Sequence, residues 1–316
     1  MDAAGRRCGV LVMHHGTPAA LAGVQAFYTE IRRGSPPPAD LLADLVRRYE
    51  AIGGTSPLAE RTRAQVAGLA AELERRCPGM FVVAHGARFA EPRIEQAVAE
   101  LVRAGARRAV GLVLAPHSST VSAGEYSRRV DAATRAAGEA PDRATLDVTM
   151  IDHWFDAGGF AVLLAGRVRQ ALARLPPAAR AGAEVVFTAH SVPLRVVEAG
   201  DTYAEQVRSS AAAVAEQVGC DRWSVAWQSA GRTPEPWLGP DLLQVIATLP
   251  AAGATGCVVC PVGFVSDHLE VLYDLDIEAR AAAERAGLPF ARTASLDDDP
   301  ALCDILAGVV TAAAGR

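Results

Sequence analysis

The chain has 316 residues, half of them hydrophobic, and a formal net charge of −5 at pH 7. This length suits two domains, the apolar content argues against disorder, and the acidic balance argues against nucleic-acid binding. No apolar run approaches the ~18 residues of a membrane span, and the N-terminus lacks the long apolar region of a signal peptide. We therefore expect a soluble cytoplasmic protein without stable membrane insertion.

Eight short and nearly continuous apolar runs predict β-strands, and amphipathic stretches lie between them. Such alternation predicts an α/β fold with parallel sheets that are covered on both faces. The runs divide four and four, so we expect two similar Rossmann-like domains, 1–155 and 156–316, each with a parallel sheet of about four strands flanked by helices. The C-terminal helix can pack back on the first domain. The strand candidates are residues 8–16, 81–86, 109–118, 146–154, 184–191, 223–229, 256–264 and 288–296.

All seven histidines lie at or just past the C-terminal end of an apolar run. In open α/β sheets, ligands bind beyond the carboxyl ends of the strands. A single histidine there usually makes local hydrogen bonds, but the whole set predicts an imidazole-rich edge on each sheet, suited to metal or proton chemistry. The seven are His14, His15, His85, His117, His153, His190 and His268.

Six cysteines in a chain of this length do not make a disulfide scaffold. Cys257 and Cys260 form a CxxC motif, but it lies in the apolar run GCVVCPVGF. Residues three apart in a strand point to opposite faces, and no second cysteine or histidine pair completes a zinc site. We predict that both thiols belong to the core.

A row of carboxylates in FVSDHLEVLYDLDIEAR raises the main functional question. Glu270, Asp274 and Glu278 are four residues apart, so they share one helical face, where like charges repel. The row is either a solvated helix face or a relay for protons or metal ions. An imidazole such as His190 with one carboxylate makes a weak site for a divalent ion.

Several segments resemble the signature segments of ferrochelatases, most closely the soluble Gram-positive and actinobacterial coproporphyrin III enzymes. The resemblance covers nearly the whole chain in order and without large insertions. The matching segments are GTP (16–18), YTEIRRG (28–34), RRYEAIGGTSPL (47–58), LAPHSST (114–120), TAHSVP (188–193), WQSAGRTPEPWLGPDL (227–242) and PVGFVSDHLEVLYDLDIEA (261–279).

The resemblance implies an enzyme that inserts Fe(II) into a porphyrin held in a cleft between two Rossmann-like domains. His190 matches the family's metal-ligating histidine and proton acceptor, and Glu270 matches its partner. Asp274 and Glu278 match an acidic line that would feed in metal or lead protons out. Two protons must leave the ring as the dication enters, so bases beside it are required.

The resemblance also implies which residues contact the porphyrin. Arginine suits its propionates because the planar guanidinium binds carboxylates bidentately. The expected contacts are Arg32, Arg33, Arg48, Tyr49, Ser56, Tyr126 and Trp237, together with His15.

Three features depart from the family pattern. His15 replaces a tyrosine that ligates the product iron in many Gram-positive members, so its role is a hypothesis. Arg88 and Phe89 replace a Lys–His pair, and any proton role there is lost. Only Cys303 lies near the C-terminus, so we predict no 2Fe–2S cluster and no tightly bound cofactor, with Fe(II) as substrate.

Alternatives remain open at this point. The short N-terminal lip and its arginines favour coproporphyrin III over protoporphyrin IX. Another tetrapyrrole chelatase, or a haem carrier without catalysis, would share much of the pattern, but a carrier has no need of the acidic row. We expect a monomer that makes at most transient contact with neighbouring haem-pathway enzymes.

Overall fold

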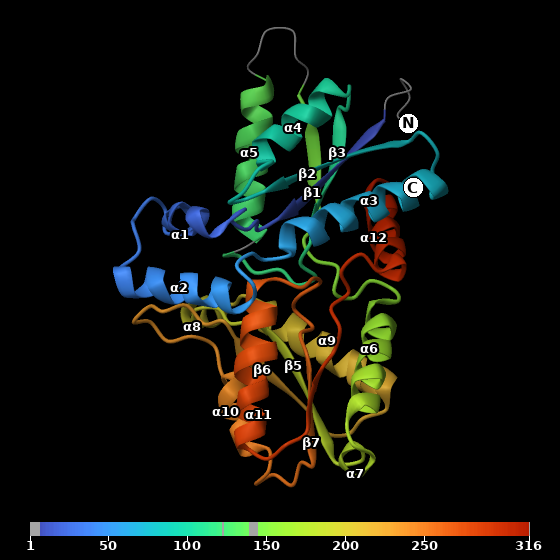
Figure 1. The fold of residues 1–316 in the computed structure, drawn as a ribbon. Coiled ribbons are helices and arrows are strands. Elements are labelled where there is room, and N and C mark those ends of the chain that lie inside the picture. The colour runs from blue at the N-terminus through green and yellow to red at the C-terminus, as the bar shows by residue number, and fades with distance from the viewer. Residues whose placement is uncertain (1–6, 122, 139–144, 316) are drawn as a thin grey trace. The chain divides into compact units, whose positions relative to one another are not determined.

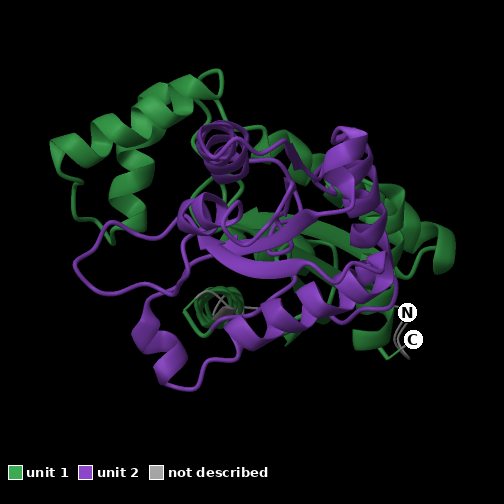
Figure 2. Cartoon of the chain, turned by 90° about the horizontal axis from the view of Figure 1, so that it is seen from below, with its two compact units in different colours: residues 1–115, 120–154, 297–316 green, residues 116–119, 155–296 purple. Residues whose placement is uncertain are grey.

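The computed structural model describes residues 7–121, 123–138 and 145–315. The chain forms two compact units, coloured separately in Figure 2. Unit 1 contains residues 1–115, 120–154 and 297–316, and unit 2 contains residues 116–119 and 155–296. Each unit is built around its own sheet.

Unit 1 holds a four-stranded parallel sheet in the order β2-β1-β3-β4 (Figure 1). Its strands are β1 (Cys8–His14), β2 (Phe81–Ala87), β3 (Arg108–Val113) and β4 (Asp147–Met150). Its helices are η1 (Leu21–Gly23), α1 (Val24–Ile31), α2 (Ala39–Ala51), α3 (Leu58–Arg76), α4 (Ile94–Arg103), α5 (Ala123–Gly138) and α12 (Pro300–Ala313).

Both faces of the unit 1 sheet are covered. Leu11 and Met13 point toward one face and pack in a core with α4 and α5. Val10 and Val12 point toward the opposite face and are equally buried. Helix α3 packs on β2, and α12 packs beside α3, as Figure 1 shows. This double cover explains why β1 reads as a continuous apolar run.

Unit 2 repeats the arrangement with the strand order β6-β5-β7-β8, again all parallel. Its strands are β5 (Ala183–His190), β6 (Trp223–Gln228), β7 (Gly256–Cys260) and β8 (Phe290–Arg292). Its helices are α6 (Phe160–Arg174), α7 (Pro177–Arg180), α8 (Leu194–Glu198), α9 (Tyr203–Val218), α10 (Leu242–Thr248), η2 (Val271–Ala279) and α11 (Arg280–Arg285).

The predicted fold class is confirmed, because each unit is a four-stranded parallel sheet flanked by helices. The core assignment of the CxxC motif is also confirmed: Cys257 and Cys260 are fully buried in β7 and unbonded to one another. None of the helices in the described residues is both long and apolar enough to span a membrane.

The two sheets share one topology, in which the first strand lies between the second and the third. The strand order reverses beside that first strand, and such a switch point is where α/β sheets bind ligands. β1 ends at His14 with His15 next in the chain, and β5 ends at His190. The topology therefore places a histidine at the switch point of each unit.

The segment with the carboxylate row differs from a regular helix. Residues Val271–Ala279 form a π-helix, which continues into α11. A π-helix is stabilised by i→i+5 hydrogen bonds and is rare beyond a single turn. Its turn takes more residues than the 3.6 of an α-helix, so a spacing of four remains close to one turn.

Candidate functional site

His190 is the last residue of β5, and its imidazole has a defined orientation. Ring atom Nδ1 lies 2.5 Å from the carbonyl oxygen of Ser191. An N–H at Nδ1 donates to that carbonyl, which leaves Nε2 to face the rest of the site. The side chain keeps 38% of its surface exposed, so the ring remains accessible to a ligand.

Glu270 lies between two imidazoles. Its Oε1 is 3.5 Å from Nε2 of His190, and its Oε2 is 3.6 Å from Nε2 of His268. His268 is oriented by its Nδ1, 3.0 Å from the carbonyl oxygen of Ser266. The structure therefore brings together His190 and Glu270, which are 80 residues apart in the sequence, and adds His268.

The charges of this cluster stabilise one another. Burial lowers the pKa of His190, but the carboxylate of Glu270 outweighs that effect and raises the pKa to about 9. Burial raises the pKa of Glu270, but the two imidazoles hold it well below its usual value. At neutral pH the metal-free site is thus an imidazolium beside a carboxylate.

Asp274 lies in the π-helix and is buried against the end of β6. Its Oδ2 accepts a hydrogen bond from Ser229 Oγ at 2.5 Å and a longer one from Gln228 Nε2 at 3.4 Å. Ser229 has a left-handed backbone with φ of 57°, an unfavourable conformation for a residue other than glycine. The WQS motif therefore carries two donors that hold Asp274, while Glu278 is only half-buried.

Trp237 lies beside the His190 imidazole, with 6.5 Å between ring centroids. Its indole Nε1 donates to Thr233 Oγ1 at 2.9 Å. Gly231 allows this position, because a Cβ on it would come within 2.2 Å of the indole ring. Trp237 thus packs beside His190 and is held there by Thr233 and Gly231 of the same loop.

In unit 1, His15 follows β1 and has an exposed side chain. Its ring lies 4.9 Å from that of Phe89 and 6.0 Å from that of Phe27, measured between centroids. Nδ1 lies 3.3 Å from the carbonyl oxygen of Gly16. Phe89 therefore supports His15, and both residues depart from the family pattern.

The three predicted arginines occupy different settings. Arg32 and Arg33 directly follow α1. The Arg32 guanidinium lies 5.8 Å from the ring centre of Tyr28. The backbone of Arg33 is left-handed, with a φ of 57°. Arg48 lies in α2, and its Nε is 3.1 Å from Asp44 Oδ2. Only Arg48 is thus paired with an acid at close range among these three.

The predicted hydroxyl groups are all buried in unit 1. The hydroxyl of Tyr49 lies 3.2 Å from Thr17 Oγ1, and Ser56 Oγ accepts from the Leu58 amide at 3.3 Å. Burial raises the pKa of Tyr126 to about 12, so its hydroxyl stays protonated and can donate. The Arg88 guanidinium lies 5.2 Å from the ring centre of Tyr126, a contact that the sequence did not suggest.

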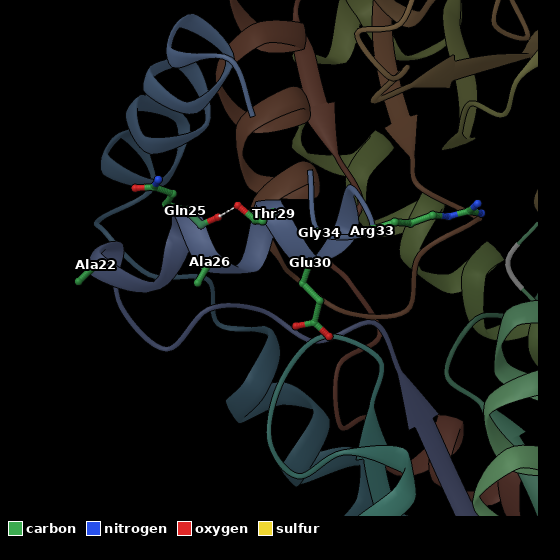
Figure 3. Close-up of a pocket in the computed structure, with 7 residues that line it drawn as sticks. All are labelled: Ala22, Gln25, Ala26, Thr29, Glu30, Arg33 and Gly34. Carbon is green, nitrogen blue, oxygen red and sulfur yellow. Dashed lines mark hydrogen bonds between the residues drawn. The ribbon is translucent and has the colours of Figure 1, made fainter. Parts of the chain in front are cut away.

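An open hollow of about 810 Å³ lies along α1. Figure 3 shows Ala22 at one end of this helix and Arg33 with Gly34 at the other. Of the predicted site residues, only Arg33 lines it. None of the residues that line the hollow is a histidine.

The remaining histidines mostly serve the fold. His14 and His85 stack at 6.1 Å between centroids, and burial lowers the pKa of His14 to about 4. His117 Nε2 lies 2.8 Å from Ser210 Oγ. Of the seven predicted histidines, His15, His153 and His190 thus follow or end a strand with the side chain at least partly exposed, and His268 joins His190 through Glu270.

The described part of the chain groups no three His, Cys, Asp or Glu side chains closely enough to hold a metal ion. His190 and Glu270 instead offer one nitrogen and one carboxylate, a donor set that suits a divalent ion. Two ligands bind a metal weakly. That is useful where the ion must be passed on, because a tightly held ion would not leave.

Tyr203 is a residue of this site that the sequence did not reveal. Its hydroxyl donates to the carbonyl oxygen of His190 at 3.1 Å. A lone tyrosine at the start of an amphipathic helix is indistinguishable in sequence from a core residue. The DTYAEQ segment offers no chemical pattern that would have singled it out.

Comparison with protein families gives a match to the Ferrochelatase model over residues 7–314. A coproporphyrin III ferrochelatase of Bacillus subtilis is 40% identical, with 98% of this chain and 99% of that protein covered. A coproporphyrin III ferrochelatase of Geobacillus kaustophilus is 41% identical over 96% of this chain and 95% of its own.

Among solved structures, the sirohydrochlorin chelatase SirB from Bacillus subtilis subspecies spizizenii, in complex with cobalt, has a similar fold. The TM-score is 0.58 at 11% identity, and the match covers 98% of this chain and 96% of that one. At this identity the likeness concerns the fold alone.

Proposed function

Because the chain belongs to the ferrochelatase family, we propose that it inserts Fe(II) into coproporphyrin III to give coproheme, with loss of two pyrrole protons, in haem biosynthesis. The relatives named as coproporphyrin III ferrochelatases match it over nearly their whole length. The observation that carries the proposal is the His190–Glu270 pair at the C-terminal end of β5.

We assign the metal and proton chemistry to unit 2. Nε2 of His190 and the carboxylate of Glu270 are the proposed ligands of the incoming Fe(II). Binding of Fe(II) displaces the proton of the His190 imidazolium. Each pyrrole N–H that is replaced by iron then releases a proton, and His190 and Glu270, which are free again once the iron has passed to the ring, are the proposed first acceptors. Asp274 and Glu278 then continue the path, with Asp274 held in place by the WQS donors.

We assign porphyrin binding mainly to unit 1. Propionates require donors with fixed positions, and guanidinium and hydroxyl groups meet that need. His15 is the proposed axial ligand of the product iron, supported by its contacts with Phe27 and Phe89. Trp237 is the proposed ring contact in unit 2. The proposed propionate contacts are Arg32, Arg33, Arg48, Tyr49, Ser56 and Tyr126.

The proposal includes no resident cofactor and no 2Fe–2S cluster, with Fe(II) and the porphyrin as substrates. We propose a cytoplasmic monomer that meets its pathway neighbours transiently. The preference for coproporphyrin over protoporphyrin IX is part of the proposal and rests on the names of the relatives.

The test is anaerobic metal insertion, followed by loss of porphyrin fluorescence. Fe(II) is offered with coproporphyrin III and, separately, with protoporphyrin IX. We expect insertion into coproporphyrin III and a loss of at least about 100-fold in the His190→Ala protein, because it loses both a ligand and a base. His153→Ala, which alters an exposed histidine after β4, is the matched control and should keep full activity.

Other outcomes would identify the alternatives. Faster insertion into protoporphyrin IX would replace the substrate but keep the reaction. Insertion of Co(II) or Ni(II) but not Fe(II) would indicate another chelatase. Tight haem binding with no rate above the protein-free control would contradict catalysis and leave a haem carrier.

A further inference from the structure

Residues 116–119 form a short segment of unit 2 whose chain neighbours on both sides belong to unit 1. We call this segment the arm. It lies in the motif LAPHSST, for which the proposed function provides no role. His117 and Ser119 in it are buried. A buried polar segment must be held by specific hydrogen bonds, so its partners are informative.

The partners of the arm lie along the start of α9. His117 Nε2 is 2.8 Å from Ser210 Oγ, and the amide of Ser118 donates to Gln206 Oε1 at 2.9 Å. The hydroxyl of Ser119 donates to Asp201 Oδ2 at 3.0 Å. Three consecutive residues thus hold the first two turns of one helix.

The same region positions Tyr203, the first residue of α9. Asp201 Oδ1 accepts from the Tyr203 amide at 2.9 Å, so one carboxylate joins the arm to the helix start. The phenol ring packs at 5.8 Å from Trp227 and at 6.3 Å, edge-on, from His117. Its orientation is therefore fixed from the arm and from β6.

The hydroxyl of Tyr203 reaches the backbone of the metal site. It donates to the carbonyl oxygen of His190 at 3.1 Å. Two residues earlier in β5, the carbonyl of Thr188 still accepts from the amide of Gly263 at 3.0 Å. Tyr203 thus holds the last residue of β5 on the side of β7, where the ladder has ended at Cys260, while the ladder with β6 still pairs His190 with Gln228 on the other side.

Small displacements of His190 affect the site. Nε2 already lies 3.5 Å from Glu270, at the outer limit of a hydrogen bond. A misplacement of about 1 Å in an active site can cost about 100-fold in rate. A group that fixes the His190 backbone therefore controls whether the two ligands can hold one ion.

We propose that Tyr203 is a positioning residue for the His190–Glu270 pair, and that the arm holds Tyr203 in place. The consequence for metal insertion rests on the proposed function. The consequence for metal binding does not, because a divalent ion that binds His190 and Glu270 requires the same alignment in the absence of porphyrin.

The first test is Tyr203→Phe in the full-length protein, which removes the hydroxyl and keeps the ring. We expect kcat for Fe(II) insertion to fall by about tenfold with KM for porphyrin unchanged, because only the metal ligands are displaced. The affinity for Zn²⁺ alone, measured by calorimetry, should weaken by at least about threefold. Thr248→Val, which removes an exposed hydroxyl that donates to the Val245 carbonyl oxygen in α10, is the matched control and should leave both values unchanged.

The outcomes separate the two proposals. No insertion by the wild-type protein, together with weaker Zn²⁺ binding in Tyr203→Phe, would reject the function and support the positioning role. Values of kcat and Zn²⁺ affinity within twofold of the wild type would overturn the positioning role. If Tyr203→Phe does not fold, Ser119→Ala replaces it. We then expect kcat and the Zn²⁺ affinity to fall by about twofold to threefold, with KM for porphyrin unchanged. Unchanged kcat and Zn²⁺ affinity in Ser119→Ala would overturn the proposal.

Discussion

At the scale of single residues, the charge state of the metal site determines its response to pH. His190 has its pKa raised to about 9 from an ordinary 6.5, where burial opposes the rise and Glu270 causes it. This pairing stabilises the metal-free protein fully below pH 6.5, and the contribution is lost as the pH rises through about 9. A metal ion competes with that proton, because it binds only neutral imidazole.

We therefore expect Zn²⁺ binding at pH 7 to release close to one proton, and its affinity to rise about tenfold per pH unit up to about pH 9. Calorimetry in two buffers of different ionisation enthalpy measures the proton count. In Glu270→Gln, loss of the carboxylate should bring the His190 pKa down and reduce the number released. No proton release in the wild-type protein would show that the imidazole is neutral before the metal binds.

At the scale of elements, Arg292 holds the π-helix to the end of β8. Its Nε and Nη2 each lie 2.8 Å from one carboxylate oxygen of Asp276, and its Nη1 is 3.1 Å from Asp267 Oδ1. The guanidinium side chain is only 11% exposed. One cation thus fixes two points of the segment on either side of Glu270 and Asp274.

We expect Arg292→Met to lower the free energy of unfolding by about 1–3 kcal/mol, because two partly buried carboxylates lose their partner. Urea unfolding measures this as a lower midpoint with an unchanged m-value. Arg195→Met is the matched control: that side chain is 68% exposed beside Glu235, and its loss should cost less than about 1 kcal/mol. Equal effects of the two changes would contradict the anchoring role of Arg292.

The strands could be predicted from the sequence, whereas the π-helix and part of the site could not. All eight strands lie within or next to the predicted apolar runs, because both faces of each sheet are covered and no polar alternation interrupts them. The π-helix was not predictable, since a spacing of four fits an α-helix and long-range contacts such as those of Arg292 are not visible locally. His190 and Glu270 are 80 residues apart, so only the family resemblance paired them, and Tyr203 had no local signal.

At the scale of the whole molecule, the end of the chain belongs to the unit with which it began. Leu302, Leu306 and Val310 of α12 are fully buried. Helix α12 packs along α3, where a Cβ on Gly68 would come within 2.5 Å of Cys303 Sγ. Unit 1 therefore depends on the last segment of the chain for one face of its core.

We expect a chain truncated after Leu296 to lose structure in unit 1, because each of these side chains contributes about 1.5–3 kcal/mol of burial. Hydrogen exchange followed by mass spectrometry should show lost protection in β1 and α3. Peptides from β5 and β7 serve as the internal control and should remain protected. Uniform protection in both units would mean that α12 is dispensable.

The arm has a further consequence for how this protein can be divided. A gene segment encoding residues 155–296 would not encode all of unit 2, because residues 116–119 come from an earlier part of the reading frame. In the excised product, Asp201, Gln206 and Ser210 would lose the hydrogen bonds that they make with the arm. Neither unit can therefore be excised as one continuous segment of the chain. A protein that contains unit 2 alone would need the arm added as a separate peptide or joined to the segment by circular permutation.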